Sequence, residues 1–378
     1  MNQSFDCIVL GLGAMGSSTV YHLAQKKKKI LGLERFSCAH ALGSSHGETR
    51  LIRKAYFEHP DYVPLLERSY ELWFELEKRS SQKLLHQTGL VIFGDPQKSD
   101  VLKGVQKSAH KYGIPMEEWG SSDFSKKFSM AKVPPHFRGL FEPSGGYLEV
   151  ENCVRAHCKE AARIGAELHF EEQIISWNRV GNGFEVRTHR GVYWSEKLVL
   201  TLGPWTADLL PTLQQDLKVH RAPLFWFDSQ GLLQKEKGVP CFAFDLPEGF
   251  FYGFTEITGQ FKIALHKPLG FVARPEAESR EVLVEEAEPV KQFVSRYFPT
   301  FSSSPQKSAL CFYTLSPDSH FILDEHSQEP GVYFGAGFSG HGFKFSSLIG
   351  EVLADWVVEG RTQNPVDFLK WDRLEKKA

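Results

Sequence analysis

Residues 5–16 read F-D-C-I-V-L-G-L-G-A-M-G, a β-rich apolar run followed directly by glycines at positions 11, 13 and 16. A helical pattern continues from there through Gln25, and Ile30 to Glu34 has the composition of a second short strand. Strand, helix and strand in this order predict a βαβ unit, in which the two strands lie parallel in one sheet. The fold class expected from this stretch is therefore α/β.

The three glycines have the G-x-G-x-x-G spacing of a dinucleotide-binding turn. Gly11 permits the tight turn, Gly13 lets a pyrophosphate approach the backbone, and Gly16 lets the helix pack close to the strand. Glu34 ends the second strand, where its carboxylate can accept hydrogen bonds from both ribose hydroxyls and disfavours a 2′-phosphate. The alternative is a plain glycine-rich turn with Glu34 in solvent, and the spacing alone does not distinguish NAD from FAD.

The pattern of strand and glycine-rich turn returns later in the chain. Lys197 to Leu202 runs into Gly203, and Gly331 to Gly342 precedes a helix that begins near Phe343. A nicotinamide dehydrogenase usually completes its nucleotide fold contiguously, so these scattered pieces favour FAD. We expect an α/β (α+β) chain with a Rossmann-like FAD-binding domain and an interleaved mixed-sheet substrate domain. The expected FAD-binding domain comprises residues 1–85, 147–215 and 320–378, and the substrate domain comprises residues 86–146 and 216–319.

Composition limits the classes of partner. The 378 residues are 42% hydrophobic and 24% charged, as in an ordinary soluble domain, and a net charge of −2 gives a nucleic-acid partner no global support. No apolar run approaches the ~20 residues of a membrane span, and the N-terminus lacks a signal-peptide pattern. The six cysteines show neither C-x-x-C nor metal-like spacing. We expect a cytoplasmic protein with free thiols, no metal, no membrane contact and no nucleic acid.

Three further segments resemble one known family. They are G-S-S-H-G-E-T-R-L-I-R-K-A-Y (43–56), C-F-Y-T-L-S-P-D-S-H-F-I-L-D (311–324) and G-A-G-F-S-G-H-G-F-K (335–344). They closely resemble the family of monomeric sarcosine oxidase, N-methyltryptophan oxidase and pipecolate oxidase, and the similarity runs nearly end to end. It implies a monomeric FAD-dependent oxidase that converts sarcosine, or another N-methyl or cyclic amino acid, to an imine and reduces O2 to hydrogen peroxide.

The resemblance also implies which residues hold the flavin. Cys311 matches the family cysteine that is bonded to the flavin 8α-methyl group, although a buried free thiol is the alternative. Ser44, His46 and Arg50 would lie close to that attachment point. Gly340 and Gly342 would let the backbone pass near the cofactor. We interpret the other cysteines as packing residues; they are Cys7, Cys38, Cys153, Cys158 and Cys241.

Arg53 and Lys344 would bind the substrate carboxylate by resemblance, and Lys344 would also lie at the flavin. The alternative is a pair of surface cations that answer nearby carboxylates. Arg50 and Arg53 are three residues apart, so on a helical turn they would face the same way. Tyr313 and His341 match pocket residues of the family. Phe251 would stand where the sarcosine oxidases have a tyrosine, which predicts a missing hydroxyl and puts strict sarcosine preference in doubt.

Lys262 matches the family lysine that stabilises the forming superoxide, and His266, four residues on, would share its face of a strand. The alternative is an exposed strand lysine and a core histidine. Two rival functions remain. An FAD-dependent dehydrogenase with another electron acceptor would not need Lys262, and a non-catalytic flavin-bearing subunit would not need the Arg53 and Lys344 clamp. An NAD dehydrogenase is a third, weaker alternative.

Overall fold

The computed structural model describes residues 4–257 and 259–375. Its strands form three sheets within those ranges. The strands of the first sheet follow the order β10 (Ile174–Val180), β11 (Gly183–Thr188), β12 (Val192–Leu200), β1 (Ser4–Leu10), β2 (Ile30–Leu33) and β9 (Glu167–His169). β19 (Val332–Ala336) pairs with β12 and with β18 (Ile322–Glu325). Parallel pairing joins β9, β2, β1, β12 and β19.

The predicted βαβ unit is confirmed at the centre of this sheet. β1 runs into α1 (Ala14–Gln25), which leads to β2. α1 packs between α5 (Val150–Arg163) and α8 (Ser346–Glu359). Gly16 is required there, because a Cβ atom on it would lie 1.8 Å from the Gly11 carbonyl oxygen. Close contact between the helix and the strand therefore explains the third glycine of the motif.

The second sheet is mixed. Its strands follow the order β17 (Lys307–Leu315), β13 (Lys218–Asp228), β16 (Gln260–Leu265), β15 (Gly249–Gly253), β14 (Cys241–Leu246), β5 (Leu90–Gly94), β7 (Arg138–Glu142) and β6 (Glu117–Trp119). β14 and β5 pair in parallel, whereas β15 pairs with its two neighbours in antiparallel fashion. One face carries an aromatic cluster with α4 (Ser121–Lys127) and α7 (Val284–Tyr297), and the other face turns toward the first sheet.

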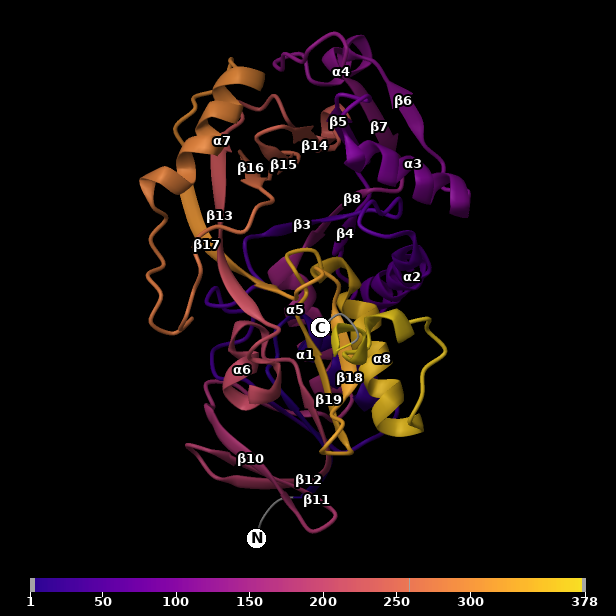
Figure 1. Ribbon diagram of the computed structural model, residues 1–378, viewed down its shortest axis with the longest axis vertical. Helices are drawn as coiled ribbons and strands as arrows, with labels where there is room; N and C mark the ends of the chain where they lie inside the picture. Colours follow the sequence, from indigo (N-terminus) through magenta and orange to yellow (C-terminus); the bar gives the residue numbers. More distant parts are fainter. Residues whose placement is uncertain (1–3, 258, 376–378) are drawn as a thin grey trace.

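A small third sheet lies between the two large ones. It consists of β3 (Thr49–Ile52), β8 (Gly146–Glu149) and β4 (Leu85–His86). In Figure 1 the second sheet lies above these strands, and the first sheet lies below them. The helical turn expected around Arg50 and Arg53 is wrong, because Arg50 lies in β3, where it pairs with Leu148, and Arg53 follows the strand. The remaining helices are α2 (Val63–Ser80), α3 (Asp100–Tyr112), α6 (Thr206–Leu209) and α9 (Asp372–Glu375).

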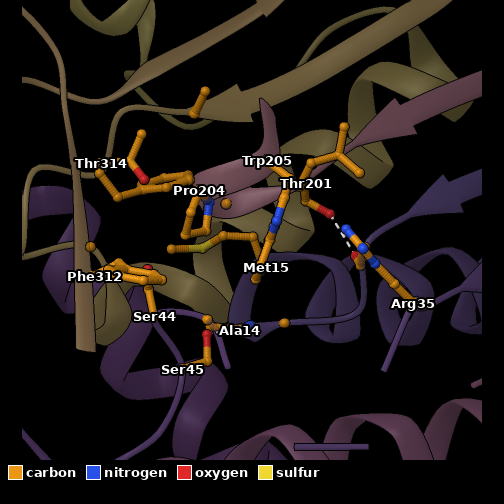
Figure 2. A pocket seen from close by; sticks show the side chains of 18 of the residues that line it. Ala14, Met15, Arg35, Ser44, Ser45, Thr201, Pro204, Trp205, Phe312 and Thr314 are labelled. Atoms are coloured by element: carbon orange, nitrogen blue, oxygen red, sulfur yellow. Dashed lines mark hydrogen bonds between the residues drawn. The ribbon is translucent and has the colours of Figure 1, made fainter. Parts of the chain in front are cut away.

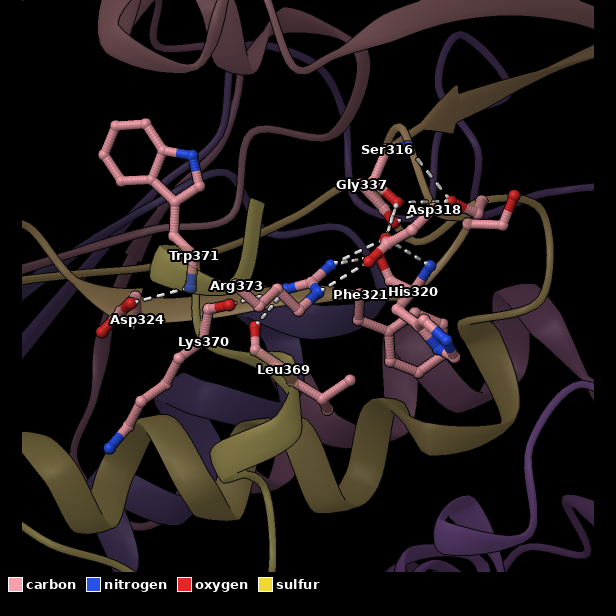
Figure 3. Close-up of polar contacts among 12 residues, drawn as sticks. Ser316, Asp318, His320, Phe321, Asp324, Gly337, Leu369, Lys370, Trp371 and Arg373 are labelled. Carbon is pink, nitrogen blue, oxygen red and sulfur yellow. Dashed lines mark hydrogen bonds and ion pairs between the residues drawn. The ribbon is translucent and has the colours of Figure 1, made fainter. Parts of the chain in front are cut away.

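The segment after β17 is anchored by the C-terminal region (Figure 3). The Arg373 guanidinium donates to both Asp318 carboxylate oxygens, at 3.0 and 3.1 Å, and to the His320 carbonyl oxygen at 3.1 Å. The Trp371 amide donates to Asp324 at 2.9 Å. This network holds a turn whose Ser319 carbonyl oxygen contacts His341, a residue of the site described below.

The two large sheets draw on interleaved stretches of the chain. Strands of the first sheet come from residues 4–33, 167–200 and 322–336, and those of the second from residues 90–142 and 218–315. The division into domains at the boundaries expected above is compatible with this grouping and stays a prediction. No helix in the part of the chain that the structure describes is long and apolar enough to cross a membrane.

Candidate active site

A cavity of about 400 Å³ lies between the first and second sheets. Figure 2 shows side chains from distant parts of the chain around it, including Met15, Ser44, Trp205 and Phe312. Of the residues singled out from the sequence, those that line it are Gly11, Gly13, Glu34, Ser44, Arg50, Cys311, Tyr313, Gly340 and Gly342. The cavity therefore joins the glycine motif to the segment around Cys311, which lies about 300 positions along the chain.

The nucleotide end of the cavity has the features of a dinucleotide site. Gly11 has a φ of +88°, and Gly13 is the N-cap of α1, so the amide groups of the first helical turn face the cavity. Glu34 is buried and accepts hydrogen bonds from the amides of Leu12 at 2.8 Å and Phe36 at 3.0 Å. Burial raises the pKa of Glu34. A carboxylate held in this way, beside a helix N-terminus and an open cavity, fits the ribose and pyrophosphate of FAD.

Cys311 lies at the other end of the cavity on β17. Arg50 Nη2 is 3.3 Å from the Cys311 sulfur atom, and Arg50 also donates to the Ser44 carbonyl oxygen at 3.3 Å. Burial alone would raise the pKa of Cys311, but Arg50 and a hydrogen bond from the buried His46 lower it to about 7. A thiol with two cationic or hydrogen-bonding neighbours is poised to react as a thiolate.

The glycine-rich turn after β19 closes the same end of the cavity. Gly340 has a φ of +79°, and a Cβ atom on it would lie 2.7 Å from the Tyr313 ring. Gly342 packs in the same way against Phe338, where a Cβ atom would come within 2.5 Å. The backbone of this turn therefore lies against the Tyr313 ring and lines the cavity.

Arg53 and Lys344 meet next to this end of the cavity. Both cations lie over the ring of Tyr56, at 4.6 and 5.2 Å from its centroid, and both are 5% exposed. Arg53 Nη2 donates to Glu58 at 2.6 Å, whereas Arg53 Nε is buried without a hydrogen-bond partner among the described residues. The alternative of surface cations is thereby excluded. A buried guanidinium with a free donor beside a second cation is suited to bind a carboxylate.

Glu58 was not expected from the sequence. Burial alone would raise its pKa, but Arg53, His341 and Lys344 together lower it. Glu58 therefore supplies a negative charge to the two cations, and a substrate carboxylate must share Arg53 with it or displace it. Its position five residues after Arg53 was the available signal, but spacing in an irregular segment does not show which side chains meet.

His341, His266 and Tyr313 complete this cluster. His341 Nδ1 is 2.6 Å from the Tyr56 hydroxyl oxygen, and its Nε2 is 2.9 Å from the Ser319 carbonyl oxygen. His266 Nδ1 is 3.1 Å from the Tyr313 hydroxyl oxygen. Burial lowers the pKa of His341 to about 3 and that of His266 to about 4, so both imidazoles are neutral at pH 7. They can exchange hydrogen bonds with a substrate without adding charge.

Lys262 lies on β16 with its side chain directed at the loop before β3. Its ammonium group donates to the carbonyl oxygens of Gly47 at 2.6 Å and Thr49 at 2.5 Å. The side chain is 3% exposed, which excludes the alternative of an exposed strand lysine. Burial, followed by the charge of Arg50, lowers the pKa of Lys262 well below its usual value. Lys262 therefore lies close to Arg50 but outside the lining of the cavity.

The placement of Phe251 in the pocket is wrong. Phe251 lies on the opposite face of the second sheet, where its ring stacks on Phe293 of α7 with centroids 4.5 Å apart. The next residue, Tyr252, faces the site and forms a hydrogen bond with Tyr313. Neighbouring residues of a strand point to opposite faces, so a difference of one position in the strand decides which of the two side chains reaches the site. Tyr252 therefore supplies the hydroxyl group that was predicted to be missing from the site.

Comparison with known proteins agrees with this geometry. Residues 6–356 match the family described as FAD dependent oxidoreductase. The chain is 36% identical to monomeric sarcosine oxidase of Streptomyces avermitilis, with 99% of both chains covered. It is 32% identical to N-methyl-L-tryptophan oxidase of Yersinia pestis, with 97% of this chain and 98% of the relative covered.

Solved structures show the same fold at lower identity. NikD, an unusual amino acid oxidase essential for nikkomycin biosynthesis, superposes with a TM-score of 0.85 at 24% identity and 97% coverage of both chains. L-proline dehydrogenase from P. horikoshii superposes with a TM-score of 0.88 at 18% identity, covering 100% of this chain and 99% of the other. The predicted fold class and resemblance are confirmed, and the chain belongs to the FAD dependent oxidoreductase family.

Proposed function

We propose that the protein is a flavoprotein oxidase that converts a secondary-amine amino acid, such as sarcosine or another N-methyl or cyclic amino acid, to an imine and reduces O2 to hydrogen peroxide. The full-length relatives act on substrates of this kind according to their names. We further propose that it works as a monomer in the cytosol. The observation that carries the proposal is the convergence of Arg53 and Lys344 beside the Cys311 end of the cavity.

Different residues around the cavity would bind the nucleotide, the flavin ring and the substrate. Glu34 and the N-terminus of α1 would hold the ribose and pyrophosphate, while Ser44, His46, Arg50 and the turn at Gly340 would hold the flavin ring. When bound there, FAD supplies the redox chemistry by accepting two electrons from the amine and passing them to O2. Arg53 and Lys344 would hold the substrate carboxylate. This would orient the carbon atom next to the amine nitrogen relative to the flavin.

Neutral side chains would complete the substrate pocket. His266 and Tyr313 form a hydrogen-bonded pair next to the clamp, and Tyr252 extends it. Because burial lowers the pKa of His266 to about 4, the imidazole is neutral at pH 7 and can form a hydrogen bond with the substrate amine. The aromatic rings of Tyr56 and Phe57 stack on Arg53 and keep water away from the ion pair.

We propose that Cys311 holds the flavin through a thioether bond. The lowered pKa of Cys311 and the contact with Arg50 support this role. Acid-precipitated protein should then remain yellow, and Cys311→Ser should release the colour into the supernatant. Wild-type protein that loses all its flavin on precipitation would disprove the bond and leave the FAD site itself intact.

The reaction is tested by a screen for peroxide release. Sarcosine, other N-methyl amino acids, proline and pipecolate are each supplied to the purified yellow protein with O2. We expect peroxide in proportion to substrate consumed for at least one of them. Each acid is paired with its decarboxylated amine, which should react much more slowly because it cannot occupy the clamp. Equal rates with acid and amine would overturn the assignment of Arg53 and Lys344.

One observation favours a second candidate, an FAD-dependent dehydrogenase. The pKa of Lys262 is lowered so far by burial and Arg50 that the charge needed to stabilise superoxide is costly to maintain. Its two hydrogen bonds to carbonyl oxygens favour the charged form in return. The same screen with an artificial electron acceptor in place of O2 separates the two. Turnover with the acceptor and none with O2 would establish the dehydrogenase.

A further inference from the structure

We propose that Glu48 positions Lys262 for the reaction with O2, because it fixes the tight turn whose carbonyl oxygens hold the Lys262 ammonium group. This role rests on the proposed function and adds a residue to it. In that reaction O2 takes two electrons and two protons from the reduced flavin and becomes hydrogen peroxide, while the flavin is oxidised. Superoxide forms when the first electron is transferred, and a cation held at a fixed place stabilises it.

Residues 47–49 form a tight turn in which Glu48 has an unusual backbone conformation. The Thr49 amide donates to the Gly47 carbonyl oxygen at 2.8 Å, so the hydrogen bond closes a three-residue γ-turn. The φ of Glu48 is +68°, a left-handed value that costs free energy in a residue with a Cβ atom. A strained residue of this kind persists only where its surroundings hold it, and such residues cluster at functional sites.

The turn presents two carbonyl oxygens to Lys262. Lys262 Nζ donates to the carbonyl oxygens of Gly47 and Thr49, at 2.6 and 2.5 Å, which flank Glu48 in the chain. The same ammonium group lies 4.3 Å from the centroid of the Phe254 ring. The place of the Lys262 charge therefore depends on the backbone conformation at Glu48.

The Glu48 carboxylate fastens this turn to the second sheet. Its Oε2 atom accepts from the Trp226 indole nitrogen at 2.8 Å, and its Oε1 atom accepts from Lys307 Nζ at 2.7 Å. Trp226 of β13 pairs directly with Lys262 of β16 on one side and with Lys307 of β17 on the other. Directly paired residues of antiparallel strands share a face of the sheet. Glu48 therefore holds the turn against the row of residues from which Lys262 reaches it.

Helix α5 holds the turn from its other side. The Glu151 carboxylate, in the first turn of α5, accepts from the amides of Gly47 at 2.8 Å and Glu48 at 3.1 Å. The Glu48 carbonyl oxygen accepts from the Val150 amide at 2.8 Å. These contacts attach the backbone of the turn to α5, whereas the Glu48 side chain attaches it to the sheet that carries Lys262. Loss of the carboxylate would leave the turn on α5 but free to shift relative to Lys262.

Glu48 also acts on the charge of Lys262. Burial lowers the pKa of Lys262, and the Arg50 guanidinium on β3 lowers it further. The carboxylates of Glu151 and Glu48 and the sulfur atom of Cys311 on β17 act in the opposite direction. Removing the Glu48 charge should therefore lower the pKa of Lys262 further, so that its ammonium group loses the proton at a lower pH. A residue that only packed the turn would not move this titration.

The test measures the reaction with O2 without any amine. The holoprotein is reduced photochemically under argon and mixed with oxygenated buffer in a stopped-flow instrument over a range of pH. Glu48→Gly removes the carboxylate and suits the left-handed conformation, so a slower reaction would not come from added backbone strain. We expect its reaction with O2 to slow by part of the ~10²–10³-fold expected for Lys262→Met. The pH at which the rate falls should also be lower than in wild type.

Glu48→Gln separates the charge of Glu48 from its hold on the turn. The side-chain oxygen of glutamine can still accept from the Trp226 indole, so the turn should stay in place while the charge is lost. We expect the same downward shift in the pH dependence, with a smaller loss of rate at low pH. Hydrogen exchange of the peptide that contains residues 47–49, which does not depend on activity, should be faster in Glu48→Gly and nearly unchanged in Glu48→Gln.

Ser81→Gly is the matched control. Ser81 is also left-handed, with a φ of +54°, but it lies at the end of α2, so its replacement should leave the rate and its pH dependence unchanged. A wild-type rate in Glu48→Gly together with a slow Lys262→Met would overturn the proposal and leave the proposed function intact. A slower rate with an unchanged pH dependence would reduce Glu48 to a packing residue and overturn it as well.

Two further outcomes distinguish the positioning role from the proposed function. A wild-type rate in Lys262→Met would overturn the positioning role, since Lys262 would then not be the cation that acts on O2. Slow reactions in both Lys262→Met and Glu48→Gly, with the expected pH shift, in a protein that releases no peroxide with any amine would support the role of Glu48. That result would overturn the proposed function instead.

Discussion

Lys344 is buried, and burial disfavours the charged form of its side chain. Burial, assisted by Arg53, lowers its pKa to about 7, so the side chain is charged below pH 7 and neutral above it. If Lys344 binds the substrate carboxylate, its contribution is present at low pH and is lost as pH rises through 7. Since kcat/KM reports the free enzyme, that parameter carries the effect.

We therefore expect the ratio of kcat/KM between wild type and Lys344→Met to depend on pH. A charge-assisted hydrogen bond contributes on the order of 1.5–3 kcal/mol, so the ratio should be roughly tenfold to a hundredfold below pH 7 and fall toward one above it. Using the ratio cancels the titration of the substrate amine, which affects both proteins. A ratio that stays constant from acid to alkaline pH would remove Lys344 from the clamp.

Replacing Lys262 should affect the reaction of the reduced flavin with O2 much more than the reduction of the flavin by substrate. Lys262→Met keeps the apolar stem and deletes the charge, and loss of one such electrostatic contact costs ~10²–10³ in rate. Stopped-flow mixing of substrate-reduced protein with O2 should show this slowing, whereas anaerobic reduction by substrate should change much less. Because Gly47 and Thr49 lose a hydrogen-bond donor, the melting temperature is measured as a control. Unaltered reaction with O2 would favour the dehydrogenase.

At the scale of elements, the two faces of β15 have different roles: one faces the site and the other packs in the aromatic cluster. Tyr252 faces the site and Phe251 faces the aromatic cluster on α7. Tyr252→Phe removes a hydrogen bond to Tyr313, so we expect kcat/KM to fall by roughly the few-fold to tenfold that 0.5–1.5 kcal/mol allows, with little change in stability.

Phe251→Ala should behave in the opposite way. Truncation of a buried phenylalanine costs ~3–5 kcal/mol of unfolding free energy, which urea titration measures. The kcat/KM of the protein that remains folded should stay close to that of wild type. A selective loss of activity in Phe251→Ala, with unchanged Tyr252→Phe, would show that the strand lies in the other register.

At the scale of the whole molecule, the cofactor cavity connects the two large sheets. The turn after β1, the end of β19 and residues 311–314 of β17 all line it, and Lys262 of β16 donates to the carbonyl oxygens of Gly47 and Thr49. A ligand that binds only the folded chain stabilises it by about 2.7 kcal/mol at a hundred times its Kd. In Cys311→Ser, where FAD would bind reversibly, we expect the melting temperature to rise with FAD concentration.

The control for this linkage is riboflavin, which lacks the groups that Glu34 and the N-terminus of α1 would bind. It should raise the melting temperature far less than FAD at equal concentration. A melting temperature independent of FAD would show that the cavity is not the cofactor site.

The sequence alone determined the features that are local in the chain. The β1–α1–β2 unit follows from periodicity, and Gly11 and Gly16 follow from backbone conformations that a side chain would obstruct. Family segments then placed Cys311 and Arg50 in one expected site, and the structure brings their side chains together. Such features can be predicted from the sequence because they depend on neighbouring residues or on whole motifs.

Only the tertiary structure decided which side chains meet across long separations. It turned Tyr252 instead of Phe251 toward the site, because strand register sets which face of the pleat is buried on which side. It also paired Glu58 with Arg53. Such contacts depend on how whole elements pack, and no local pattern of residues records that packing.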